Sequence, residues 1–255
     1  MEYLKHLSKR DLIALFSICH EAKTVRKPYQ LRNCLQKLET MILFDGVLSV
    51  YIGIEDIEKR RPPNCFYNTL NFSGELFHKY MNGRHYEKSS VCQAILASWR
   101  PQHWKTSWAR DTSGKGRVSM QLVKSYGYLD GWTTAVYHRR LSTLSSFTFA
   151  GKKAEKNKRT AAFLNCLSPH LAESLNDIYS SSFIKQKAIK HLKLTKREVE
   201  VLKWLAQGKS TWDVSVILNR SESVIKYHVT NLMERLSAQN RAHAVAIALR
   251  QGLID

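Results

Sequence analysis

The sequence predicts two domains, an N-terminal α+β domain over residues 1–180 and an all-α domain of four helices over residues 194–255. The length of 255 residues is enough for one large domain or two modest ones. Residues 1–180 mix helical apolar spacing with β-branched runs, which favours helices around a sheet. From Leu194 onward the chain has no proline and keeps helical spacing. The polar stretch 181–193, which contains serine and several lysines, predicts a linker between the two domains.

The N-terminal domain is expected to begin with helices and then enter its sheet. Apolar residues recur at helical spacing in residues 1–40, which predicts two helices. The β-branched stretch 41–54 predicts a strand, and a polar loop with prolines follows from Glu58 to Asn64. Helices are predicted within residues 75–110. Two strands follow at 128–138 and 141–151, joined by a tight turn at Arg139 and Arg140. A basic loop at 151–160 then leads into a helix that Pro169 is expected to bend.

Capping residues divide the C-terminal domain into its helices. Thr195 and Glu198 have the spacing of a capping box, and Gly208 is expected to end that first helix. Ser210 and Ser221 are expected to cap the second and third helices. The predicted buried positions are Val199, Leu202, Leu205, Val214, Ile217, Leu218, Val224, Ile225, His228, Leu232, Leu236, Ala244, Val245, Ile247, Ala248 and Leu249.

Two of these helices are separated by a short turn at Asn219 and Arg220, which predicts a helix-turn-helix. The segment from Leu194 to Ile254 resembles the DNA-binding domain of LuxR-type transcription regulators. This resemblance implies a regulator that binds an inverted repeat as a dimer. The residues that carry it are Leu194, Thr195, Arg197, Glu198, Val201, Leu202, Gly208, Lys209, the run from Lys226 to Asn231, Asn240, Arg241, Ala244, Val245 and Gly252 to Ile254.

The helix that follows Ser221 is the expected recognition helix, whose outward face reads base edges in the major groove. Lys226, Tyr227 and Thr230 match the positions that read bases in LuxR-type regulators. Lys209 and Asn231 are the expected contacts to DNA phosphates. A structural role is the competing interpretation for two residues of this helix. His228 and Asn231 can also pack or cap, and for His228 we favour packing.

A phospho-receiver domain starts with alternating strands and helices and places paired acids after its first strand, whereas residues 1–20 predict a helix without such an acid pair. The N-terminal domain resembles instead the autoinducer-binding domain of acyl-homoserine-lactone receptors. That resemblance implies an α-β-α sandwich, in which an antiparallel sheet with helices on both faces encloses a ligand. It rests on the segments 75–91, 126–138 and 145–151, on Trp104, and on the helix from Ala161 to Tyr179, where the family has a long helix involved in dimerisation.

The family pattern predicts a ligand site. Aromatic residues can line such a cavity or can simply form core, and Tyr86, Trp99, Trp108 and Tyr126 keep both interpretations open. The residues singled out as ligand-binding are Leu76, Tyr80, Ser89, Trp104, Gly131 and Trp132.

Two of these residues depart from the family pattern. Leu76 stands where the family has a tryptophan that donates to the lactone carbonyl. Ser89 stands where it has an aspartate that accepts from the ligand amide, and Ser90 replaces the following proline. An aliphatic side chain cannot donate, and the loss of a charge-assisted hydrogen bond costs about 1.5–3 kcal/mol. The resemblance therefore implies a signal other than a standard acyl-homoserine lactone.

The charge balance indicates a polyanionic partner. The 40 Lys and Arg residues exceed the 21 Asp and Glu residues by 19. Residues 1–150 hold 22 of the basic and 12 of the acidic residues, so the excess extends beyond the C-terminal domain. The N-terminal half either adds non-specific, salt-dependent attraction to DNA or attracts an anionic ligand or a membrane surface.

No cofactor or metal ion is expected. The cysteines Cys19, Cys34, Cys65, Cys92 and Cys166 are odd in number and far apart, which indicates reduced thiols rather than disulfides or a zinc site. The N-terminal apolar run is too short for a membrane span and lacks the flanks of a signal peptide. We therefore expect a cytoplasmic protein without a membrane partner.

The leading hypothesis is a sequence-specific transcription regulator of the LuxR, quorum-sensing type. Its expected partners are double-stranded DNA with an inverted-repeat operator, a second copy of the chain, a small-molecule signal and RNA polymerase. A ligand-independent dimer with a vestigial pocket stays open because of Leu76 and Ser89. An enzyme docked on DNA is disfavoured, because no cysteine or serine stands in a recognisable catalytic motif.

Overall fold

The computed structural model describes residues 4–58 and 65–254. It divides into two compact units, residues 1–180 and residues 181–255, which are called here the N-terminal and C-terminal units. The loop predicted from Glu58 to Asn64 lies outside the described residues after position 58. No helix of the described part is long and apolar enough to cross a membrane.

The N-terminal unit is built on one antiparallel sheet of five strands in the order β2-β1-β5-β4-β3. β1 and β5 pair along their whole length, with Gly46 opposite Ala150 and Gly53 opposite Thr143. The strands are β1 Gly46–Gly53, β2 Cys65–Leu70, β3 Gln102–His103, β4 Asp130–His138 and β5 Thr143–Gly151.

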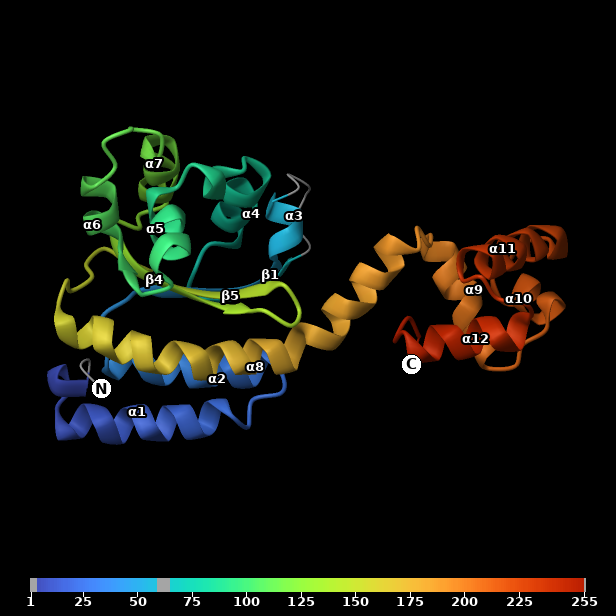
Figure 1. The fold of residues 1–255 in the computed structure, drawn as a ribbon, viewed down its shortest axis with the longest axis horizontal. Coiled ribbons are helices and arrows are strands. Elements are labelled where there is room, and N and C mark those ends of the chain that lie inside the picture. Colours follow the sequence, from blue (N-terminus) through green and yellow to red (C-terminus); the bar gives the residue numbers. More distant parts are fainter. Residues whose placement is uncertain (1–3, 59–64, 255) are drawn as a thin grey trace. The chain divides into compact units, whose positions relative to one another are not determined.

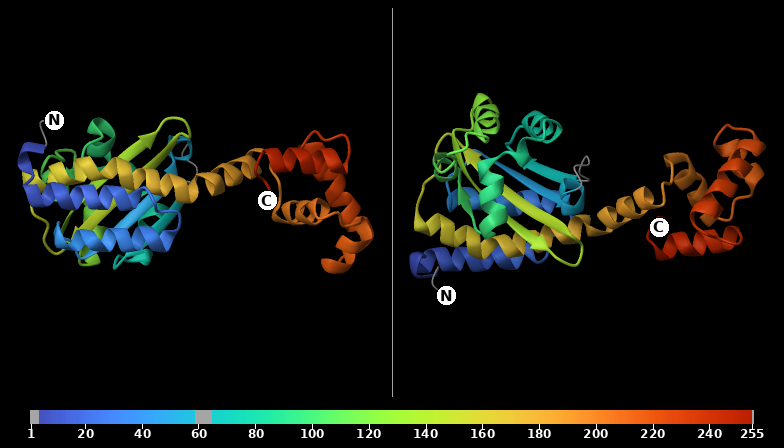
Figure 2. Two further views of the ribbon diagram at one scale, coloured as in Figure 1. Left: turned by 90° about the horizontal axis from the view of Figure 1, so that it is seen from below. Right: turned by 45° about the horizontal axis from the view of Figure 1, so that its top comes forward.

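Helices cover both faces of this sheet, so the predicted α-β-α sandwich is confirmed (Figure 1). One face carries α3 Ile54–Glu58, α4 Gly74–Asn82, α5 Ser90–Ser98, α6 Trp104–Ala109 and α7 Arg117–Ser125. The other carries α1 Lys9–Ala22, α2 Pro28–Gln36 and α8 Lys158–His191, which lie side by side across the strands (Figure 2). Short 3₁₀ turns occupy Leu4–His6, Lys37–Thr40 and His85–Glu87.

The two faces of the sheet have different packing. Strand side chains alternate between faces, so Tyr51, Phe147 and Phe149 point toward α8 and are fully buried. Polar contacts mark the same face: Thr134 Oγ1 lies 2.8 Å from Ser168 Oγ of α8. The opposite set of side chains on β1, β4 and β5 faces α4 to α7 and lines a cavity.

An ion pair between the buried Asp11 and the half-buried Arg159 joins the starts of α1 and α8. Asp11, in the first turn of α1, accepts from Arg159 Nε at 3.0 Å and from Arg159 Nη2 at 2.5 Å. Asp11 also completes a capping box with Ser8. The hydrogen bonds from Arg159 outweigh burial and hold the pKa of Asp11 well below its ordinary value. The pair ties two helices that are 148 residues apart in the chain.

The structure differs from the prediction for the linker. α8 runs without a break from Lys158 through Pro169 to His191, and the boundary between the two units falls inside it. Most of the predicted linker 181–193 is therefore helical. A polar, lysine-rich composition permits a solvated helix as readily as a loop, because lysine has good helix propensity.

After the end of α8, the C-terminal unit contains the four predicted helices. Thr195, Ser210 and Ser221 cap the first three as expected, each accepting from the amide three residues ahead. Gly208 adopts φ +76°, as its predicted role at a helix end requires. The helices are α9 Lys196–Ala206, α10 Thr211–Ile217, α11 Glu222–Arg235 and α12 Arg241–Arg250.

Some predicted core positions of this unit are wrong. Val224 is 38% exposed, whereas Val229, which was not predicted, is buried. The inward stripe of α11 starts at Ile225 and recurs four and seven residues later, so Val224 lies about 100° away from it. Ile217 and Leu249 are likewise exposed.

Candidate ligand pocket and DNA-binding surface

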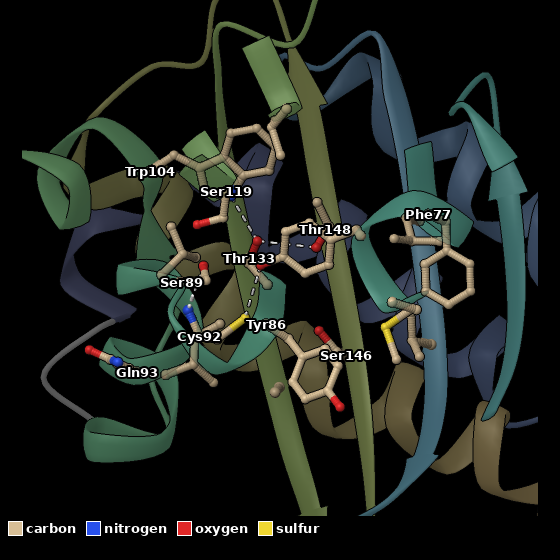
Figure 3. Close-up of a pocket in the computed structure, with 18 of the residues that line it drawn as sticks. Phe77, Tyr86, Ser89, Cys92, Gln93, Trp104, Ser119, Thr133, Ser146 and Thr148 are labelled. Atoms are coloured by element: carbon tan, nitrogen blue, oxygen red, sulfur yellow. Dashed lines mark hydrogen bonds between the residues drawn. The ribbon is translucent and has the colours of Figure 1, made fainter. Parts of the chain in front are cut away.

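A cavity of about 420 Å³ lies between the sheet and the helices α4 to α7 (Figure 3). This volume is within the range of small-molecule sites in proteins. The strands β1, β4 and β5 form its floor, and α4 and α5 supply much of its wall. The cavity therefore lies on the sheet face opposite α8.

Four of the six predicted ligand residues line this cavity: Leu76, Tyr80, Ser89 and Trp104. Gly131 does not line it but lies behind Trp104. A Cβ on Gly131 would stand 2.9 Å from the Trp104 ring and 2.7 Å from the carbonyl oxygen of Phe149. Only glycine leaves room for the indole to lie against β4, so Gly131 positions Trp104.

Trp132 does not belong to the cavity. Its neighbour Thr133 faces the ligand side, so Trp132 points to the other face of the sheet. There its Nε1 donates to the carbonyl oxygen of Glu155 at 3.1 Å, and its ring packs on His103. Of the other aromatic candidates, Tyr86 and Trp108 line the cavity, whereas Trp99 and Tyr126 do not.

A chain of hydrogen bonds fixes the Trp104 end of the cavity. Trp104 Nε1 donates to Thr133 Oγ1 at 2.8 Å, and that oxygen lies 3.1 Å from Thr148 Oγ1 on the next strand (Figure 3). Trp104 is 5% exposed, so this bond forms away from bulk water. The indole orientation is thus set by β4 and β5.

A second polar group of the wall joins α4 and α5. Tyr80 Oη lies 3.5 Å from Cys92 Sγ. Ser89 is the N-cap of α5, and its Oγ accepts from the Cys92 amide at 3.4 Å. Burial raises the pKa of Tyr80 well above its ordinary value and also raises the pKa of Cys92. Both groups therefore stay protonated and neutral at physiological pH.

The surface expected to bind DNA is the exposed face of α11. Lys226 is exposed and pairs with Glu222 at 3.0 Å one turn earlier. Tyr227 is 65% exposed, and Thr230 is exposed with its Oγ1 donating to the Lys226 carbonyl at 3.1 Å. These three predicted base-reading residues share one outward face.

The other residues named for DNA contact lie at the edges of this face. Lys209 is exposed just before α10, and Asn231 is half-buried on α11. His228 is also half-buried, with its ring 5.8 Å from that of Tyr227. The inner side of α11 is fixed by Arg235, which donates to Glu198 Oε2 at 3.0 Å.

Two family models match this chain. The autoinducer binding domain matches residues 30–175, and the bacterial regulatory proteins of the luxR family match residues 192–248. This chain belongs to the LuxR family of transcription regulators. The two matches cover the unit that holds the cavity and the unit that holds α11.

Two curated relatives support this assignment of the LuxR-family chain. It is 28% identical over 169 residues to the transcriptional activator protein VanR of Vibrio anguillarum, covering 65% of this chain and 68% of the relative. It is 30% identical over 157 residues to the transcriptional activator protein LuxR of Aliivibrio fischeri, covering 61% of this chain and 62% of that protein. Each alignment therefore spans about two thirds of this chain and about two thirds of the relative.

Solved structures show the same fold. The crystal structure of Escherichia coli SdiA is 16% identical, covers 94% of this chain and 98% of its own, and superposes with a TM-score of 0.50. A structure of SdiA in complex with octanoyl-rac-glycerol is 15% identical, covers 96% of this chain and 97% of its own, and gives 0.51. The two-unit architecture of this LuxR-family chain is therefore shared along nearly its whole length.

Sequence reasoning missed several residues of the cavity in this LuxR-type regulator. Phe77, Cys92, Thr133, Ser146 and Thr148 all line it. The strand residues carry a signal that could have found them, because small polar residues alternate with aromatic ones along β5. The helix residues carry no such signal, since Phe77 and Cys92 read as ordinary core positions of amphipathic helices.

Proposed function

We propose that this LuxR-type regulator binds an inverted-repeat operator as a homodimer through α11, and that a small molecule in the N-terminal cavity controls this binding. The observation that carries the first part is the outward face of α11, where Lys226, Tyr227 and Thr230 lie together on a capped helix whose opposite side is core. Such a helix can enter the major groove while its scaffold stays rigid.

The DNA-binding proposal is tested with Lys226→Ala and Thr230→Ala in the full chain. A duplex operator is first selected from a random-sequence library by the wild-type protein, and affinities are then measured by fluorescence anisotropy at fixed salt. Each contact to a base is worth about 1–3 kcal/mol, so the double variant should bind at least about tenfold more weakly. Lys115→Ala removes one exposed charge from the N-terminal unit and serves as the control. Unchanged affinity in the double variant would refute the role of α11.

The homodimer is supported by an apolar stripe on α1. Leu12, Ile13 and Phe16 are 40%, 63% and 77% exposed. Leu12 and Phe16 border a groove that α1 forms with Cys166 and His170 of α8. A standard interface buries about 800 Å² on each partner, so these three side chains would form only part of the contact surface. A second copy of the chain would cover this stripe.

The oligomeric state of Phe16→Glu tests that surface. We expect wild type to run as a dimer in light scattering coupled to gel filtration, and the variant to shift to monomer. Val118→Glu introduces the same charge at another exposed apolar position, 60% accessible on α7, and should stay dimeric. A monomeric wild type, or a dimeric Phe16→Glu protein, would contradict the proposed surface.

The control of DNA binding by a ligand is supported by the cavity itself. Its 420 Å³ are not filled by the protein's own side chains, as they would be if the site were only a relic. The pocket also lacks the donor and the carboxylate that Leu76 and Ser89 replace, so the signal differs from a standard acyl-homoserine lactone. Tight operator binding by protein purified without ligand, unchanged by any extract of the host, would favour the ligand-independent dimer instead.

Further parts of the proposal rest on the family alone. Since the LuxR family is one of transcription regulators, we infer that the chain is not an enzyme. We also infer that it works in the cytoplasm and contacts RNA polymerase at its promoters. Deleting the gene and sequencing the transcripts would show whether it activates or represses.

A further inference from the structure

We propose that an exposed surface of the N-terminal unit binds single-stranded nucleic acid. This surface, called here the aromatic–arginine surface, consists of Trp99, Arg100, Tyr137, Arg139 and Arg140. None of the five residues lines the cavity, and the surface belongs to a different unit from the duplex site proposed on α11. The inference follows from the geometry of the two rings, from their exposure and from the charge of the elements that carry them.

The rings of Trp99 and Tyr137 form a stack that is open to solvent. Trp99 is the C-cap of α5, and Tyr137 lies near the end of β4, against which α5 packs (Figure 1). The ring centroids are 5.7 Å apart, and the ring planes make an angle of 25°. Trp99 is 41% exposed and Tyr137 is 37% exposed, whereas Tyr128, which stacks on Phe72, is 9% exposed. Exposed apolar area of this kind indicates an interaction surface.

The end of α5 does not itself require a tryptophan. Trp99 has φ +53° and ψ +30°, and in this left-handed conformation its amide donates to the Ile95 carbonyl oxygen at 2.7 Å. Glycine is the usual residue at such a helix end, because an L side chain is strained there. The indole is therefore not explained by the folding of α5, and its contact with Tyr137 and with solvent remains as its role.

The elements that carry the two rings are basic. Arg100, Arg139 and Arg140 are all exposed, and the last two form the turn after β4. Residues 88–110 and 131–154, which hold α5, most of β4 and all of β5, contain no Asp or Glu. The acid-bearing helix α3 follows β1, which β5 separates from β4. The charge of the surface therefore fits an anionic partner.

A ring stack beside arginines matches the two parts of a nucleotide. Bases stack on exposed aromatic rings, and arginine side chains contact phosphates. In a duplex the neighbouring bases cover each base face, whereas a single strand can present its bases to the protein. An acidic peptide could pair with the arginines but offers no base to extend the stack. The combination of rings and arginines therefore favours a single strand over both other polyanions.

Competition on the full-length protein tests the class of partner. Fluorescein-labelled oligothymidylate and oligouridylate of about 12 nucleotides are titrated by fluorescence anisotropy. A duplex of scrambled sequence is present at a concentration that saturates the duplex binding of the protein, α11 included. We expect at least one of the labelled strands to bind under these conditions, and the comparison of the two shows whether DNA or RNA is preferred. Absence of binding, or displacement by polyglutamate as readily as by the unlabelled strand, would overturn the inference.

A set of tryptophan variants tests the stacking. Trp99→Ala should weaken the binding of the single strand at least about fivefold. Trp99→Phe keeps an aromatic ring and should recover most of the affinity, which separates stacking from an effect on the fold. Trp212→Ala removes a tryptophan that is 63% exposed on α10 and should leave the affinity unchanged. Equal losses in Trp99→Ala and Trp212→Ala would contradict the proposed surface.

The arginines are tested by the salt dependence of binding, which still decides if Trp99→Ala does not fold. The logarithm of the affinity for a single strand falls with the logarithm of the salt concentration by roughly 0.7 per phosphate contacted, so Arg139→Gln with Arg140→Gln should reduce this slope by about 1.4. Lys115→Gln with Arg117→Gln removes the same charge from exposed positions at the start of α7 and should leave the slope unchanged. The same change of slope in both double variants would indicate a general charge effect and overturn the inference.

Discussion

Replacing Gly131 by alanine should disturb both the stability of the N-terminal unit and its cavity. The added Cβ would stand 2.7 Å from the carbonyl oxygen of Phe149 and 2.9 Å from two carbons of the Trp104 ring. The carbonyl belongs to the neighbouring strand β5 and cannot retreat without breaking the sheet, so the indole must move. Ordinary contacts begin near 3.4 Å, which requires a displacement of about half an ångström.

That displacement has two energetic consequences. Overpacking a close-packed interior costs about 1–3 kcal/mol. The shifted indole also weakens the 2.8 Å bond from Trp104 Nε1 to Thr133 Oγ1, which is buried and worth about 0.5–1.5 kcal/mol. Gly131→Ala should therefore destabilise the N-terminal unit by about 2–4 kcal/mol.

Guanidinium unfolding followed by tryptophan fluorescence measures this loss. The control is Gly74→Ala, since a Cβ there meets only Tyr67 Oη at an ordinary 3.9 Å at the start of α4. It should be neutral or slightly stabilising, because alanine has the higher helix propensity. A midpoint of Gly131→Ala equal to that of the control would refute the close approach of Trp104 to β4.

Two further predictions concern ion pairs. Burial would raise the pKa of Glu198, but the hydrogen bonds from Thr195 and the pair with Arg235 hold it below its ordinary value. Its contribution is therefore complete above about pH 4.3 and is lost as pH falls through the lowered pKa. Glu198→Gln should lower the free energy of unfolding of the C-terminal unit at pH 7 by about 1–3 kcal/mol. In guanidinium titrations at a series of pH values, the variant should also lose less stability than wild type as the pH is lowered. The same loss of stability with falling pH in both proteins would contradict this. The pKa of Asp11 is held well below its ordinary value by Arg159, so Asp11→Asn should likewise destabilise the N-terminal unit at pH 7. The difference in thermal stability between wild type and variant should begin to shrink only below about pH 3.9, the ordinary aspartate pKa, and should vanish as the pH falls through the lowered pKa.

The elements that local chemistry specifies were predictable from the sequence. Thr195, Ser210 and Ser221 define helix starts through a side-chain oxygen and an amide three residues away, so no distant contact is needed. The end of α8 was not predictable in this way. Its continuation beyond residue 180 lacks a stop signal, and a lysine-rich composition is compatible with linker and helix alike.

The site was predictable only at the positions in the chain that the family pattern specifies, whichever residue stands there. Leu76, Tyr80, Ser89 and Trp104 line the cavity, but their order in the chain does not show which strand residues face them. Trp132 illustrates the reason. A shift of one position along β4 reverses the face, so the choice between Trp132 and Thr133 depends on the register with β5 rather than on residue type.

The position of Ser89 explains why its replacement of an aspartate changes the pocket and not merely its polarity. An aspartate has two carboxylate oxygens, so it can cap a helix with one and accept from a ligand with the other. A serine has a single oxygen, and in this chain that oxygen accepts from the Cys92 amide at the start of α5. The helix requires its cap whatever the ligand is. At position 89 the cavity therefore presents a neutral hydroxyl whose oxygen already caps α5, where an aspartate would present a charged oxygen free of the cap.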